Sequence, residues 1–168
     1  MNKLILLILL FPALVAAGSE TVAEKATPQE VHEKVAAAVQ FLSASGEKGL
    51  REFENPNGKF VWKDTYVWVT QCEKQYCLPS PVSHKIGLMS KVRCLKTGKF
   101  YILDLCGEVA ENDSGAWVEY WWSKPGTDEL RRKVSFMMQV PGTPYQVVSG
   151  IYDKSTTLED LYKITNRK

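Results

Sequence analysis

Apolar and polar residues alternate over three segments in the second half of the chain, a pattern typical of β-strands whose two faces differ. The first segment covers residues 115–122 and has four aromatic side chains in its last six positions. Segments 133–140 and 145–152 follow, each after a turn rich in proline and glycine. Because neighbouring side chains in a strand point to opposite faces, Trp117 lies on one face, and Tyr120 and Trp122 lie on the other. The three segments together predict an antiparallel meander.

Helical spacing of apolar residues dominates the first part of the chain. Thr27 and Glu30 have the spacing of a capping box, and Pro28 suits a first helical position, so we expect a helix to begin there. Its apolar positions recur until Gly46. The same kind of spacing predicts three further helices: a short one around Leu50 and Phe53, one over residues 100–112 and an amphipathic one over residues 156–164.

Two more strands are expected before the meander. Residues 60–70 are rich in aromatic and β-branched residues and predict the first strand; residues 77–81, with two prolines, predict its short hairpin partner. Residues 82–96 predict a loop with a helical turn near 86–89. This order predicts an α+β domain, with a five-stranded antiparallel sheet and a long N-terminal helix and further helices packed on it.

The first 17 residues have the pattern of a cleavable signal peptide. Lys3 precedes an apolar stretch, and small residues lead up to Gly18. The apolar stretch has about 14 residues, fewer than the ~20 of a membrane-spanning helix; an uncleaved anchor is the alternative. We expect residues 18–27 to form a flexible tether, 28–153 the domain and 154–168 a C-terminal helical tail. The protein is predicted to be periplasmic or secreted, with no membrane span after signal cleavage.

Net charge and cysteine content limit the possible binding partners and predict the state of the cysteines. Without the leader the net charge is about +1 and the basic residues are dispersed, which argues against nucleic-acid binding. An even number of cysteines in an exported chain favours disulfides. Cys72 and Cys77 flank a short loop, so we predict a bond between them and a second one between Cys94 and Cys106. The alternative is a zinc site, but the spacing does not suit one, and we predict no metal and no cofactor.

Several short segments occur in a distinctive order. They are Phe-Glu-Asn-Pro-Asn-Gly-Lys-Phe at 53–60, Asp-Thr-Tyr-Val-Trp-Val at 64–69, Ile-Gly at 86–87, the strand at 115–122 with Pro125, Lys-Val-Ser-Phe at 133–136 and Gly-Ile-Tyr at 150–152. Together they resemble the single Cache domain family of extracytoplasmic PAS-like sensor domains. The resemblance covers residues 28–152. It implies a PAS-like fold whose sheet and overlying loops enclose a pocket for small organic acids or similar metabolites.

The resemblance also implies a set of ligand-binding residues on three strands: Tyr66, Trp68, Trp117, Tyr120, Trp122, Lys133 and Ser135. In this interpretation Lys133 neutralises a carboxylate, hydroxyl groups hydrogen-bond it, and tryptophan rings exclude water. Which face of the 117–122 strand lines the pocket is left open at this point.

The leading hypothesis is an exported ligand-binding protein that binds a small carboxylate and takes part in extracytoplasmic signal sensing, with a membrane receptor or another periplasmic protein as partner. The alternative is a periplasmic interaction module with a vestigial pocket, whose aromatic strand would form an exposed patch. An enzyme is not expected, because the chain has no recognisable catalytic motif. Asp104 and Glu108 lie four residues apart on one predicted helix, where a solvated helix face is the expected role, and the separation of His84 from them in the chain gives no support for a shared cleft.

Overall fold

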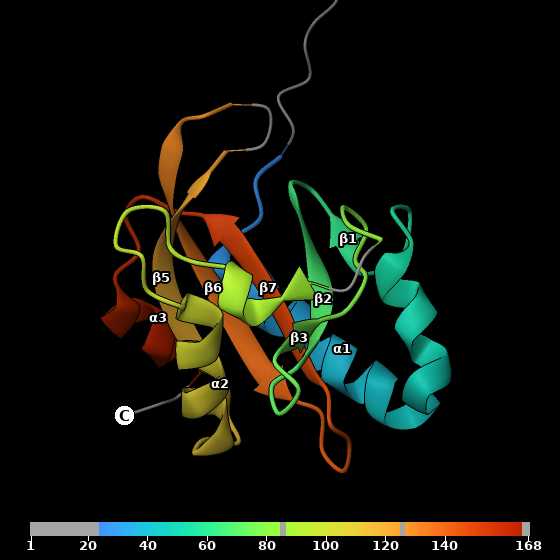
Figure 1. Ribbon diagram of the computed structural model, residues 1–168. Coiled ribbons are helices and arrows are strands. Elements are labelled where there is room, and N and C mark those ends of the chain that lie inside the picture. The colour runs from blue at the N-terminus through green and yellow to red at the C-terminus, as the bar shows by residue number, and fades with distance from the viewer. Residues whose placement is uncertain (1–23, 85–86, 125–126, 166–168) are drawn as a thin grey trace, which may run out of the picture.

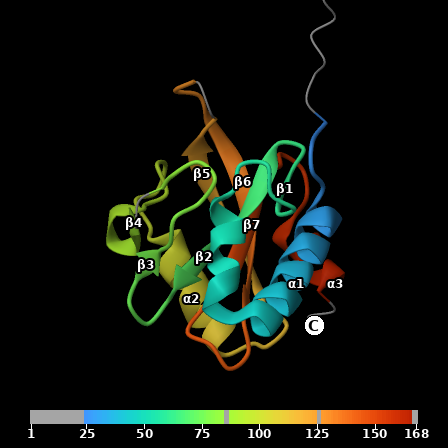
Figure 2. The same cartoon turned by 90° about the vertical axis from the view of Figure 1, so that its right-hand side faces the viewer.

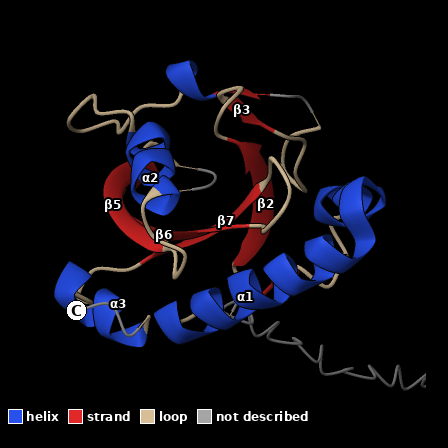
Figure 3. Cartoon of the chain, turned by 90° about the horizontal axis from the view of Figure 1, so that it is seen from below, coloured by secondary structure: helices blue, strands red, loops and turns tan. Residues whose placement is uncertain are grey.

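A curved antiparallel sheet lies at the centre of the structure, a computed structural model that describes residues 24–84, 87–124 and 127–165 (Figure 1). Seven strands form it within these ranges, in the order β4-β3-β2-β7-β6-β5, with β1 paired to β2 off that path. Their bounds are β1 Val61–Trp62, β2 Thr65–Gln71, β3 Tyr76–Cys77, β4 Gly87–Leu88, β5 Ala116–Ser123, β6 Leu130–Gln139 and β7 Gln146–Tyr152. Seen from below, the sheet curls around helix α2 (Tyr101–Ala110), while helix α1 (Pro28–Ser45) lies outside the curve (Figure 3).

The α+β class is confirmed, but the prediction of five strands is wrong. The segment 60–70 is divided by a turn in which Lys63 has a φ of 46°, so β1 and β2 form a hairpin of their own. Strand β4 lies in the predicted loop and is followed by the 3₁₀ turn η2 (Met89–Lys91), while residues 85–86 are outside the described ranges. The added strands have two residues each, which is too short for any alternation to be visible in the sequence.

The meander of β5, β6 and β7 is confirmed. Trp117 lies opposite Phe136, and Tyr120 lies opposite Lys133, which in turn faces Tyr152. Directly opposed residues share a face of the sheet. Trp117 and Phe136 therefore belong to the outer face, and the other three residues belong to the inner face.

Helix α1 covers the outer face, with the 3₁₀ helix η1 (Gly46–Glu54) beside it (Figure 2). The capping box at its start is confirmed: the Glu30 N–H donates to Thr27 Oγ1 at 3.2 Å, and the Thr27 N–H donates to Glu30 Oε2 at 2.8 Å. The buried side of α1 is formed by Val31, Val35, Ala38 and Leu42. Helix α3 (Leu158–Ile164) begins after its cap Thr157 and buries Leu161 in the same core.

Helix α2 lies on the inner face and is attached to the end of β2 by a disulfide between Cys72 and Cys106, whose Cα atoms are 5.6 Å apart. Both predicted disulfides are therefore wrong, and Cys77 and Cys94 are free thiols. The register explains the first error: Cys77 pairs with Thr70 across the β2–β3 hairpin and not with Cys72. Proximity in the chain did not indicate that α2 would place Cys106 over the end of β2.

The predicted signal peptide over residues 1–17, and the part of the tether before residue 24, lie outside the described ranges. The last three residues of the predicted tail, 166–168, do so as well. In the part of the chain that is described, no helix combines the length and the apolar character that crossing a bilayer requires.

Candidate ligand-binding site

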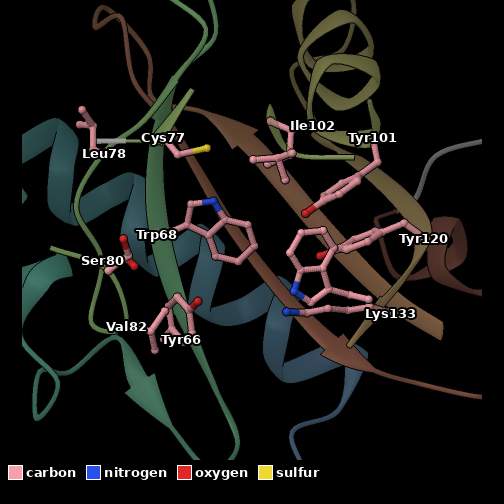
Figure 4. A pocket seen from close by; sticks show the side chains of 14 residues that line it. Tyr66, Trp68, Cys77, Leu78, Ser80, Val82, Tyr101, Ile102, Tyr120 and Lys133 are labelled. Atoms are coloured by element: carbon pink, nitrogen blue, oxygen red, sulfur yellow. The ribbon is translucent and has the colours of Figure 1, made fainter. Parts of the chain in front are cut away.

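A cavity of about 360 Å³ lies between the inner face of the sheet, the start of α2 and the segment that contains β3 and β4 (Figure 4). Its size is at the lower end of the range for small-molecule pockets. Fourteen of the described residues line it: Tyr66, Trp68, Cys77, Leu78, Ser80, Val82, Ser83, Gly87, Val92, Tyr101, Ile102, Tyr120, Trp122 and Lys133.

Aromatic rings form two opposing walls of this cavity. Strand β2 supplies Tyr66 and Trp68, two residues apart and so on one face of the strand, with ring centroids 5.8 Å apart. On the other side, the ring of Tyr120 in β5 stacks on that of Tyr101 in α2, with centroids 3.5 Å apart. Trp122 meets both of these tyrosines edge-on. Figure 4 shows Tyr66 and Trp68 facing Tyr101 and Tyr120 across the space between them.

Lys133 brings a positive charge into these aromatic surroundings. Its Nζ lies 6.0 Å from the ring centroid of Trp68 and 5.2 Å from that of Tyr152. The Nζ has no hydrogen bond or ion pair with any residue in the described ranges. Desolvation by burial lowers the pKa of Lys133 to about 8, and the negative charge of Asp64 offsets this only in part. Within the described residues, the ammonium form thus has no acidic side chain at ion-pair distance.

The Tyr120 hydroxyl is held in place from below the cavity. It forms a hydrogen bond of 3.0 Å with the hydroxyl of Ser135, in which either oxygen can be the donor. Gly150 lies opposite Ser135 in the sheet, and a Cβ at that position would collide with the Ser135 hydroxyl. Burial raises the pKa values of Tyr120 and Tyr101 above the usual range of tyrosine. Both phenols are therefore protonated at neutral pH and can act as hydrogen-bond donors.

The sequence model of the Cache domain family matches residues 29–157, which is most of the chain. The chain belongs to the Cache domain family. The inner-face pocket described above is thus a pocket of a Cache domain, and the sequence-based recognition of this family is confirmed.

Two solved structures share the fold. One is a Cache chemosensory domain described for its recognition of carboxylic acids; it has 18% identity and a TM-score of 0.53, and the match covers 75% of this chain and 88% of that one. The other is a methyl-accepting chemotaxis protein from Vibrio parahaemolyticus RIMD 2210633, with 15% identity, a TM-score of 0.51 and coverage of 71% and 82%. No curated protein sequence matches the chain.

The Cache domain brings most of the predicted ligand-binding residues to the cavity: Tyr66, Trp68, Tyr120, Trp122 and Lys133. Ser135 is buried beneath them and does not line the cavity, but its hydroxyl forms a hydrogen bond with that of Tyr120. Trp117 lies on the outer face, where its ring centroid is 4.8 Å from that of Phe136 in the core. The geometry gives no support to a ligand contact by Trp117.

Sequence reasoning missed the contribution of α2 and of the segment around β3 and β4. Tyr101 and Ile102 belong to a helix whose apolar face was predicted, but a helical pattern does not show which face of a sheet the helix will cover. Cys77 was predicted as a disulfide partner, and residues 77–81 as a short hairpin partner of the first strand, without a place in the ligand-binding set. The aromatic side chain of Tyr101 at the start of an apolar helix was the one available signal.

A second cavity, of about 480 Å³, lies near the start of α1 and the end of β7. Exposed charged side chains form much of its border, and Arg132 there is already held by Glu119 at 2.7 Å and by the main-chain oxygen of Asp153 at 3.1 Å. Within the described residues, no three His, Cys, Asp or Glu side chains come together as metal ligands would. The inner-face cavity is therefore the candidate site.

Proposed function

We propose that this Cache domain is an exported sensor domain that binds a small organic carboxylate in the inner-face cavity, without chemical conversion. One observation carries the proposal: the Lys133 ammonium lies among aromatic rings and forms no ion pair or hydrogen bond with an acidic side chain in the described residues. A half-buried, desolvated charge without an ion-pair partner is unfavourable, and a ligand carboxylate would supply the missing charge through a strong charge-assisted hydrogen bond.

The surrounding residues suit this role. Figure 4 shows the hydroxyls of Tyr101 and Tyr120 and the Nζ of Lys133 directed into the same part of the cavity. Protonated phenols can donate hydrogen bonds to a carboxylate that Lys133 holds. Trp68 and Trp122 line the same region with apolar rings, which would exclude water around a bound carboxylate and strengthen each of these interactions.

Two further observations support the sensing role. The fold is shared with a Cache chemosensory domain described for carboxylic acid recognition. The disulfide between Cys72 and Cys106 suits the oxidising compartment that the predicted signal peptide implies. We therefore propose an extracytoplasmic location and a membrane receptor or another periplasmic protein as the partner that responds to the bound ligand.

The alternative of an interaction module with a vestigial pocket requires the aromatic strand to form an exposed patch. Trp117 and Tyr120 are instead buried, and Trp122 is half-buried in the cavity wall. This arrangement supports ligand binding over protein docking by that strand.

The test is calorimetric titration of the purified protein with a panel of small carboxylates, after a thermal-shift screen has identified those that stabilise it. Lys133→Met removes the ammonium and keeps an apolar stem, so we expect it to lose about 2–5 kcal/mol of binding free energy. Lys74→Met is the matched control, because Lys74 is exposed in the β2–β3 turn, away from the cavity. Equal carboxylate affinity in Lys133→Met and the control would contradict the proposed role. No carboxylate binding by the folded protein would favour the interaction module.

A further inference from the structure

The charges at the cavity restrict the ligand more than the proposed function does. Among the described residues that line it, Lys133 is the only cation and none is acidic. A dicarboxylate bound here would bury a second negative charge without a partner. An α-amino acid would bring its own ammonium close to Lys133 with no carboxylate to receive it. The described part of the lining therefore fits a single negative charge on the ligand.

The shape of the lining adds a second restriction. Figure 4 shows Lys133 at one end of the cavity, and Ile102 and Cys77 at the other. Burial raises the pKa of the Cys77 thiol to about 11, so that end is uncharged at neutral pH. Between the two ends run the rings of Trp68 on one side and of Tyr101 on the other. A ligand that fills this space has one anionic end and an apolar body between two aromatic walls.

A two- or three-carbon acid would occupy only the Lys133 end. The apolar walls beyond it would then stay in contact with water, and the hydrophobic contribution of those walls to binding would be lost. A flat ring in the same place would contact aromatic faces on both sides, in the offset or edge-on geometries that such rings prefer. The cavity of about 360 Å³ has room for a body of that kind.

We infer that the ligand of this Cache domain is a monocarboxylate with an aromatic body, bound with its carboxylate at Lys133 and its ring between Trp68 and Tyr101. The inference rests on the proposed function, since it assumes that Lys133 binds a carboxylate. Trp68 is then a specificity-determining residue, which selects the ring and leaves the carboxylate contact to Lys133.

The test compares ligands that differ by one feature, in calorimetric titrations of the whole protein. The reference is 3-phenylpropanoate; propanoate lacks its ring, L-phenylalanine adds an ammonium, succinate replaces the ring by a second carboxylate, and 3-phenylpropanamide removes the charge. We expect 3-phenylpropanoate to bind at least tenfold more tightly than each of the others. Propanoate, succinate or phenylalanine binding as tightly would overturn the inference and leave the proposed function standing. Equal binding of the amide, or no binding by any carboxylate, would overturn both.

A variant pair tests the role of the ring wall directly. Trp68→Leu keeps an apolar side chain and removes the aromatic face, so the ratio of the 3-phenylpropanoate affinity to the propanoate affinity should fall at least fivefold. Trp62→Leu is the matched control, because Trp62 lies in β1, packs against the outer core and does not line the cavity. An unchanged ratio in Trp68→Leu, with the melting temperature of the control, would contradict the assignment.

Discussion

The two faces of the sheet are built from the same kinds of residue, but the outer face is packed as a core and the inner face borders a cavity. On the outer face the side chains of Trp117 and Phe136 are almost wholly buried, at 1% and 0% exposure, under helix α1. On the inner face Tyr120 is as well buried, but Trp122 and Lys133 border a cavity. Aromatic content alone therefore does not separate a core from a binding site.

The covering helices account for the difference. The buried side of α1 consists of small and branched residues such as Val35 and Ala38, which let the helix lie close along the sheet. Helix α2 covers only part of the inner face, where its disulfide holds Cys106 to the end of β2. Among the described residues, no further α-helix covers the remaining space. It is bordered by the segment that contains β3 and β4, and the cavity lies there.

The largest expected effect is a difference in unfolding free energy between a tryptophan deletion on the outer face and one on the inner face. Trp117→Ala leaves a void in a filled core and should lower the free energy of unfolding by about 3–5 kcal/mol. Trp122→Ala, at the cavity wall, should cost roughly 1 kcal/mol. Urea denaturation of both variants measures the difference. Equal losses would mean that the inner wall is as tightly packed as the core.

The disulfide should matter chiefly for the inner face. The double variant Cys72→Ser, Cys106→Ser should lose about 2–4 kcal/mol of unfolding free energy, and its ligand affinity should fall because the Tyr101 wall is no longer held. Denaturing alkylation without reductant, read by peptide mass spectrometry, should label Cys77 and Cys94 in the wild type. Labelling of Cys72 or Cys106 would contradict this connectivity.

Gly150 links the backbone of the sheet to the cavity floor. Gly150→Ala should displace Ser135 and with it the Tyr120 hydroxyl, at a cost of about 1–3 kcal/mol in stability, and should weaken ligand binding. Gly107→Ala is the matched control: nothing lies within 4 Å of its Cβ position on α2, and Ala is the better helix former there by about 1 kcal/mol. Chemical denaturation and titration of both variants would test this. A Gly150→Ala variant with unchanged stability and unchanged ligand affinity would contradict the proposed role of Ser135 in positioning the Tyr120 hydroxyl.

The smallest expected effect is a pH dependence confined to the inner face. The pKa of Lys133 is lowered to about 8 in the free protein, so below that pH the ammonium is present to receive a carboxylate. Above it, binding must first restore the proton, and carboxylate affinity should fall about tenfold per pH unit. Titrations from pH 6.5 to 9.5 measure the slope, and Lys133→Met should flatten it. A flat wild-type profile would contradict a direct Lys133–carboxylate contact.

The amino-acid sequence by itself determined the features that depend on neighbours in the chain. The capping box at Thr27 and Glu30 and the meander of β5 to β7 follow from local hydrogen bonding and from period-two alternation. The same alternation placed Tyr120 and Trp122 together on one face and Trp117 on the other, and the family was recognisable from short segments in order.

Only the tertiary structure decided which of those faces became a cavity. That outcome depends on how closely α1 and α2 approach the sheet, and helical periodicity carries no information about the partner of an apolar face. The disulfide shows the same limit: Cys72 is near Cys77 in the chain, yet the hairpin register separates them and α2 brings Cys106 into place. Tyr101 became part of the site, and Trp117 part of the core, because long-range packing selects among faces that local patterns leave equivalent.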